Sequence, residues 1–118
     1  MVRRATAQSL GAIGPDQVAD KLLSQLAKEA NGSVRGAIAE AMQSWTTPTP
    51  DAVLTVRNLL PTEVDENARL HMAMFLGKNL STFPESEQLL RQLLRVEQSK
   101  NVRQKVAETL AKNSLHTQ

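Results

Sequence analysis

The sequence predicts an all-α protein, an α-solenoid (an α/α superhelix) in which about seven helices stack as antiparallel pairs. Three observations lead to this fold class. Similar segments recur about every 34 residues, their apolar residues recur every three to four positions, and aromatic residues make up only 3% of the chain. A core with so few rings has to be built from Leu, Ala, Val and Met, which favours packed helices over a β-sandwich or barrel.

One set of similar segments opens with Val or Ala followed by arginine. The four segments read VRRATAQSLGAI, VRGAIAEAMQSW, ARLHMAMFLGKN and VRQKVAETLAKN, and their first residues are 32, 34 and 34 positions apart. Ala recurs at the sixth position and Leu or Met at the ninth, so each segment can pack a small and a large apolar group against its neighbours. Ser33, Asn67 and Asn101 precede three of these segments, and we expect them to cap the helices.

A second set of helix starts lies between these segments. Pro15-Asp16, Pro50-Asp51 and Pro84-Glu85 are 35 and 34 positions apart, and each is followed by apolar residues three and four apart. Proline suits a first helical turn because its missing N–H has no partner there, and the acid suits the positive end of the helix dipole. Together the two sets predict helices near residues 2–13, 16–29, 34–45, 51–60, 67–80, 85–97 and 102–113.

One helix pair of this size cannot bury its apolar stripe alone, so the pairs are expected to stack into a single domain over residues 1–118. The spacing divides this domain into a half-repeat, 1–14, and three repeats, 15–48, 49–82 and 83–118. Because the first helix has no partner before it, we expect the chain to be an excerpt of a longer array. The alternative is that residues 1–13 form a half-repeat cap. An uncapped N-terminal end would expose apolar surface and favour self-association.

The arginine-containing segments resemble the second helix of a HEAT repeat, whose pattern is VRxxAAxALG with a capping residue shortly before it. The match is best from Val2 to Gly11, and the segment from Ala68 to Gly77 follows, with Phe75 where a small residue is usual. The short period is similar to that of the HEAT-like repeats of the phycobilisome lyase type. The resemblance covers nearly the whole chain and implies an armadillo-like superhelix, but such arrays serve many unrelated tasks.

The sequence contains no recognisable catalytic or metal-binding motif. There is no Cys, and the two histidines, His71 and His116, lie 45 residues apart. Neither is followed by Glu, as the metal-binding histidines are in some HEAT-like hydroxylases. The chain also has no P-loop and no Gly-rich dinucleotide turn. We therefore expect a protein that is not an enzyme and that holds no cofactor or metal.

The expected binding surface is the concave face, which the second helix of each pair usually lines in HEAT-like arrays. We expect the third and seventh positions of each segment, counted from its Val or Ala, to point outward. Leu70 and Met74 occupy these positions in the third segment and form an apolar pair beside His71. The alternative is that both pack against neighbouring helices. A protein-binding scaffold is the resulting prediction, with these candidate partner-binding residues: Leu70, His71, Met74, Arg4, Glu40, Gln104 and Glu108.

We expect the recurrent arginines and the single tryptophan to have structural roles. Arg3, Arg35, Arg69 and Arg103 open the four segments, and we expect each to pack its stem along a helix interface and to bond a neighbouring turn. The alternative is an anion-binding stripe. Trp45 ends the second segment, and we expect it in the core.

Two other functions remain open at this point. Residues 91–118 hold six basic and two acidic residues, so nucleic acid is an alternative partner for the C-terminal repeat. Against it, Glu40 and Glu108 interrupt the concave face and stacking aromatics are scarce. A lyase-like or chaperone-like subunit rests on the type of repeat alone. The lack of Cys fits a cytoplasmic location, and no apolar run is long enough to suggest a membrane partner.

Overall fold

The computed structural model describes residues 15–45 and 48–117. Over these residues the chain is helical and contains no strand, which confirms the all-α repeat fold. The helix expected over residues 2–13 lies outside the described residues. In chain order the elements are α2 (Pro15–Lys28), α3 (Gly32–Met42), α4 (Pro50–Leu59), the 3-10 turn η1 (Leu60–Thr62), α5 (Glu66–Lys78), α6 (Ser86–Val96) and α7 (Lys100–Thr117).

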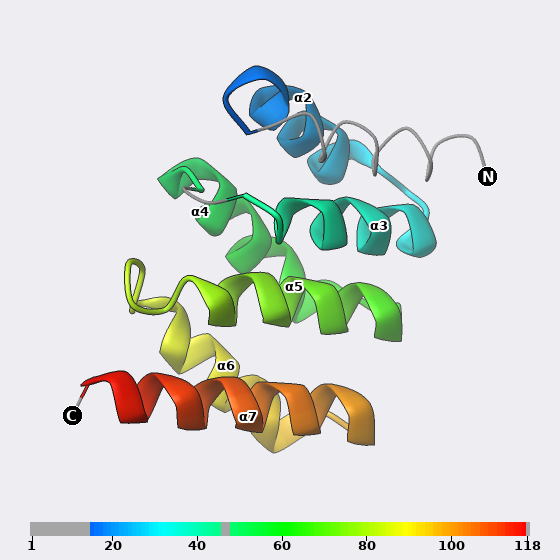
Figure 1. Cartoon of the computed structure of the whole chain (residues 1–118). Coiled ribbons are helices and arrows are strands. Elements are labelled where there is room, and N and C mark those ends of the chain that lie inside the picture. The colour runs from blue at the N-terminus through cyan, green and yellow to red at the C-terminus, as the bar shows by residue number, and fades with distance from the viewer. Residues whose placement is uncertain (1–14, 46–47, 118) are drawn as a thin grey trace.

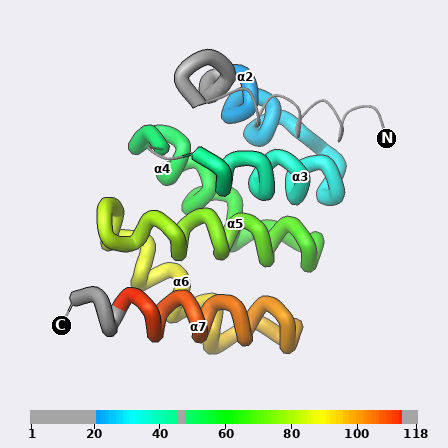
Figure 2. The backbone as a smooth tube through the Cα atoms, in the orientation of Figure 1, coloured from blue at the N-terminus to red at the C-terminus, as the bar shows by residue number. Residues whose placement is uncertain are grey.

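The helices form two layers (Figure 1). One layer contains α3, α5 and α7, which run in the same direction, and the other contains α2, α4 and α6, which run against them (Figure 2). Within the first layer, α5 packs between α3 and α7. Each helix pair therefore contacts mainly the pairs before and after it, as the repeat spacing predicts.

The caps of the first layer recur every 34 residues. Asn31 Oδ1 accepts hydrogen bonds from the backbone N–H of Ser33 at 2.9 Å and of Val34 at 3.2 Å. Asp65 Oδ2 and Ser99 Oγ play the same part before α5 and α7, accepting from the N–H groups three residues on, at 2.9 and 3.3 Å. The capping side chains serve N–H groups that have no partner inside the helix.

The expectation that Ser33, Asn67 and Asn101 cap these helices is therefore wrong. All three helices begin one or two residues earlier than expected, so these three residues lie in the first helical turn. Each true cap lies two residues before the residue that was expected to cap the helix, and it has an equally suitable side chain.

In the second layer, two of the three helices begin at the proline that the sequence predicts as their start. Helices α2 and α4 begin at Pro15 and Pro50, and Thr49 caps α4 by accepting from the N–H of Ala52 at 3.2 Å. Helix α6 differs, because Pro84 lies in a turn and the helix begins only at Ser86. The proline and its acid stand ahead of the first turn of α6 and not inside it.

Small residues let the helices of the first layer approach closely. A Cβ atom on Gly36 would lie only 3.0 Å from Asn67 Nδ2 and 3.3 Å from Ala68 Cα, and one on Gly77 would clash with the Thr109 side chain. Gly36 is accordingly buried against α5 and does not point outward, so the expectation for the third position of this segment is wrong. The third position of the α7 segment, Gln104, is exposed as expected.

The second layer is more open. Beside η1 and α6 it leaves a groove of about 670 Å³ lined by residues of both elements. Since α3, α5 and α7 are spaced more closely than α2, α4 and α6, the first layer is the inner layer of the array and the second is the outer layer.

The hydrophobic core lies between the two layers. It includes Trp45, which is 1% exposed, so the expectation of a core tryptophan is confirmed. Ala39 and Ala73 are buried as well, whereas Ala107 of α7 is exposed because no described helix covers that side of α7. The other larger buried side chains are Leu22, Leu26, Val34, Ile38, Met42, Val53, Val56, Leu60, Met72, Phe75, Leu76, Leu80, Leu90, Leu93, Val102, Val106 and Leu110.

Replacing Ala73 with Arg tests the close packing of the inner layer. Ala73 is 2% exposed, in the middle of a helix that is covered on both sides, so Ala73→Arg forces a long charged group into a packed interface. We expect the free energy of unfolding to fall by about 3 kcal/mol or more, measured by circular dichroism during urea denaturation. The matched control is Ala107→Arg, the same change at the exposed equivalent position. Equal losses in both variants would contradict the packing described here.

Candidate functional site

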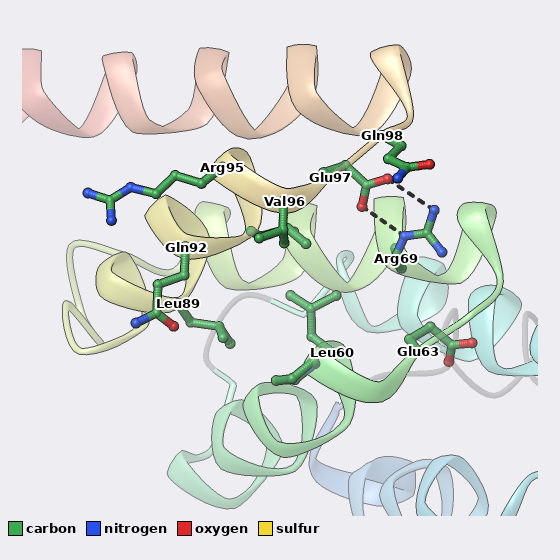
Figure 3. Close-up of a pocket in the computed structure, with 11 residues that line it drawn as sticks. Leu60, Glu63, Arg69, Leu89, Gln92, Arg95, Val96, Glu97 and Gln98 are labelled. Atoms are coloured by element: carbon green, nitrogen blue, oxygen red, sulfur yellow. Dashed lines mark hydrogen bonds and ion pairs between the residues drawn. The ribbon is translucent and has the colours of Figure 1, made fainter.

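Buried ion pairs connect successive repeats. Arg35 of α3 donates to Glu63 through Nε at 2.6 Å and through Nη2 at 2.8 Å, and its Nη1 donates to the carbonyl oxygen of Glu29 at 2.9 Å. Arg69 of α5 repeats this geometry one repeat later. It donates twice to Glu97, at 2.8 and 3.0 Å, and once to the carbonyl oxygen of Val64, at 2.9 Å. Figure 3 shows the second of these bridges.

The two glutamates are almost completely withdrawn from water. Their side chains are 1% exposed in Glu63 and 3% in Glu97. Burial by itself raises the pKa of each carboxyl group, but the hydrogen bonds from arginine and from a backbone N–H (of Asp65 and Ser99) outweigh it. The pKa of both groups is therefore below its ordinary value. The same hydrogen bonds raise the pKa of Arg35 and Arg69.

The structural reading of the arginines is confirmed for Arg35 and Arg69, which bond neighbouring turns as expected. Arg103 is exposed, and no ion pair is found for it among the described residues, while Arg3 lies outside them. Sequence reasoning missed the glutamate partners Glu63 and Glu97. A signal for them exists, because the glutamates at 29, 63 and 97 also recur every 34 residues, each six positions before an arginine.

The exposed side of the inner layer contains most of the candidate residues, starting with a polar cluster between α3 and α5. Gln43 Nε2 donates to His71 Nδ1 at 2.9 Å and to the carbonyl oxygen of His71 at 3.3 Å. Because Nδ1 accepts, a neutral His71 carries its proton on Nε2, which lies 3.9 Å from Glu40 Oε1. The structure thus brings together two of the predicted residues, Glu40 and His71, from different repeats.

The apolar pair is neither fully buried nor fully open. Leu70 is half-buried and packs against the hydrophobic core, and Met74 is also half-buried. Met74 lines a groove of about 440 Å³ between α5 and α7, together with Lys78, Lys105 and Glu108. Of the two predicted apolar residues, Met74 is therefore the one that borders a hollow of the surface.

Charged groups surround this groove. Lys105 Nζ lies 3.7 Å from Glu108 Oε2, and Gln104 Nε2 donates to Glu108 Oε1 at 3.4 Å. Lys78 donates to the carbonyl oxygen of Gln43 at the end of α3. Glu40, His71, Met74, Lys105 and Glu108 thus follow one another across three helices, and we call this set the inner surface.

Other predicted features lie elsewhere or have no counterpart. Arg4 is outside the described residues. Among residues 15–45 and 48–117, no group of three or more His, Cys, Asp or Glu side chains could hold a metal ion. Within the same residues, no helix combines the length and the apolar character needed to cross a membrane.

Comparison with known proteins identifies the repeats. A family model described as HEAT repeats matches residues 19–111, which is more than half of the chain. This description does not specify the phycobilisome lyase type. Comparisons with curated proteins and with solved structures gave no match.

Acid should weaken the array through its two buried carboxylates. The pKa of both carboxyl groups is lower in the folded chain than the ordinary value of 4.5. Between the unfolded and the folded pKa, the unfolded chain therefore binds more protons than the folded chain. The stabilisation is complete above the unfolded pKa and is lost as the pH falls through the lower, folded pKa. Urea denaturation at pH steps between about 6 and 3 should show this loss, and Glu63→Gln should make the curve flatter.

The same variant should also be less stable at neutral pH. Glu63→Gln removes the charge that compensates Arg35, so the free energy of unfolding at pH 7 should fall by about 3 kcal/mol. Glu85→Gln is the control, because Glu85 is exposed and no ion pair is found for it among the described residues. A Glu63→Gln variant as stable as this control would show that the bridge does not hold the repeats together.

Proposed function

We propose that this chain, which belongs to the HEAT repeat family, is a non-catalytic scaffold that binds another protein on the inner surface of α3, α5 and α7. The observation that carries the proposal is the continuity of that surface. Side chains from three successive repeats adjoin there, and a groove of about 440 Å³ is lined by residues of both α5 and α7.

The chemistry of the inner surface suits a protein partner. Met74 supplies a flexible apolar group, and acidic and basic groups lie on both sides of it. An apolar centre with a polar rim is the usual arrangement of a protein interface. Leu70, one turn before Met74, is half-buried and packs against the hydrophobic core.

The same surface fits nucleic acid less well. Glu40 and Glu108 are 46% and 48% exposed in their side chains, so two carboxylates would face a phosphate backbone. Lys105 lies beside one of these carboxylates, and Lys78 is occupied at the end of α3. The positive charge of the C-terminal repeat is therefore partly compensated where the inner surface is hollowed.

A photo-cross-linker placed at Met74 tests the proposal. With p-benzoylphenylalanine at this position, irradiation of cells that express the chain should give a discrete adduct containing a second protein, identified by mass spectrometry. The matched control has the cross-linker at Leu54 of α4, which is 50% exposed and belongs to the outer layer. Met74→Asp, tested with the identified partner, should weaken binding by about tenfold or more.

Two results would contradict this function. One is a protein adduct from Leu54 with none from Met74. The other is salt-sensitive binding of RNA or DNA in a gel shift that is lost in Lys105→Gln and Lys112→Gln, which would support the nucleic-acid alternative.

A further inference from the structure

The outer layer contains two grooves at equivalent positions of successive repeats. The first has about 220 Å³ and is bordered by Leu26, Thr62 and the Arg35–Glu63 bridge. The second has about 670 Å³ and is bordered by Leu60, Val96 and the Arg69–Glu97 bridge. A shift of 34 positions converts each of these residues of the first groove into its counterpart in the second. The two grooves are therefore formed by equivalent backbone positions with different side chains.

The second groove is larger, and one of its lining residues is apolar where the equivalent residue of the first groove is polar. Val96 replaces Thr62, and Pro61 replaces Ala27. The Val96 residue is 74% exposed although it borders the groove, whereas Leu60 is 1% exposed. In Figure 3, Val96 of α6 lies above Leu60, with Leu89 at one end of the groove and the Arg69–Glu97 bridge at the other. An exposed valine beside an apolar hollow is surface that a partner side chain can cover.

Among the charged side chains that line this groove, one positive charge has no ion pair with another described residue. Both carboxylates that line it, Glu63 and Glu97, are held by arginines in bidentate bridges. Arg95 is exposed at the rim, and no ion pair is found for it among the described residues. The amide side chains of Gln92 and Gln98 also line the groove and can bond a peptide backbone. The groove thus offers an apolar floor, amide groups and an uncompensated positive charge.

We propose that this groove binds an extended, acidic peptide segment of a partner protein. A bulky apolar side chain of the segment lies between Leu60, Leu93 and Val96, and a carboxylate close to it in sequence pairs with Arg95. The first groove does not bind such a segment, because it is smaller and has Thr62 at the position of Val96. This site is on the opposite layer from the inner surface and does not depend on it.

Selection from a library of phage-displayed random dodecapeptides on the full chain tests this proposal. Enriched peptides, synthesised with a fluorescein label, should combine a large apolar residue with an acidic one nearby. Their Kd, measured by fluorescence anisotropy, should rise about tenfold in Val96→Asn, a few-fold in Val96→Thr and a few-fold in Arg95→Gln. Val96 is exposed, so these variants should keep the melting temperature of the unmodified chain.

Each change has a matched control on the same molecule. Val64 is 83% exposed and does not line the groove, so Val64→Asn should leave the Kd unchanged. Arg91 lies one turn before Arg95 and is paired with Glu87 at 2.9 Å, so Arg91→Gln should also have no effect on the Kd. Met74→Asp should leave it unchanged as well, which separates this test from that of the inner surface.

Three results would overturn the proposal. The first is a selection that enriches no peptide. The second is a set of peptides whose Kd does not respond to Val96→Asn. The third is a chain that self-associates in analytical ultracentrifugation and becomes monomeric in Val96→Asn, because the occupant would then be a second copy.

Discussion

The bidentate bridge between an arginine of one repeat and a glutamate of the next is the interaction on which this array depends. Each repeat touches mainly its neighbours, so no distant contact corrects the rotation of one repeat against another. Glu63 and Glu97 are nearly inaccessible to water, and a poorly aligned arginine would leave a buried charge uncompensated. The same carboxylates accept the N–H groups of Asp65 and Ser99, the residues that cap α5 and α7. Docking between repeats is thereby joined to the start of the next helix.

With the rotation fixed, the rest of the molecule becomes periodic at its surface. Gly36 and Gly77 permit close approach in the inner layer, and the outer layer opens into grooves beside each bridge. The differences between equivalent positions then stand out against a constant frame. Met74 occupies the position of Glu40 and Glu108, and Val96 occupies that of Thr62. Both differences replace a polar group with an apolar one at a groove of the surface. For this reason we propose binding sites at Met74 and Val96.

The sequence predicts the architecture well because the same pattern of helix starts and apolar residues occurs in each repeat. The period of 34 residues, the buried alanines and the proline starts of α2 and α4 were all readable in advance. The caps were misplaced because Ser, Asn and Asp crowd each helix start, and only geometry shows which oxygen meets the free N–H groups. Glu63 and Glu97 were missed although they keep the period, since their partners lie 28 residues away across an interface. The grooves depend on the spacing of the layers, which no pattern of residues expresses.

The bridges also bear on how the two proposed surfaces act together. Arg69 lines the outer groove, and the same helix, α5, holds His71 and Met74 on the inner surface. Because Arg69 is fixed to Glu97 by two hydrogen bonds, the wall of the groove is already in place before any peptide arrives. A ligand that meets a preformed wall does not require α5 to move, and coupling between two sites requires an element whose two states both sites bias. We therefore expect the two proposed surfaces to bind independently, so that a peptide in the outer groove leaves the affinity of the inner surface for its partner unchanged.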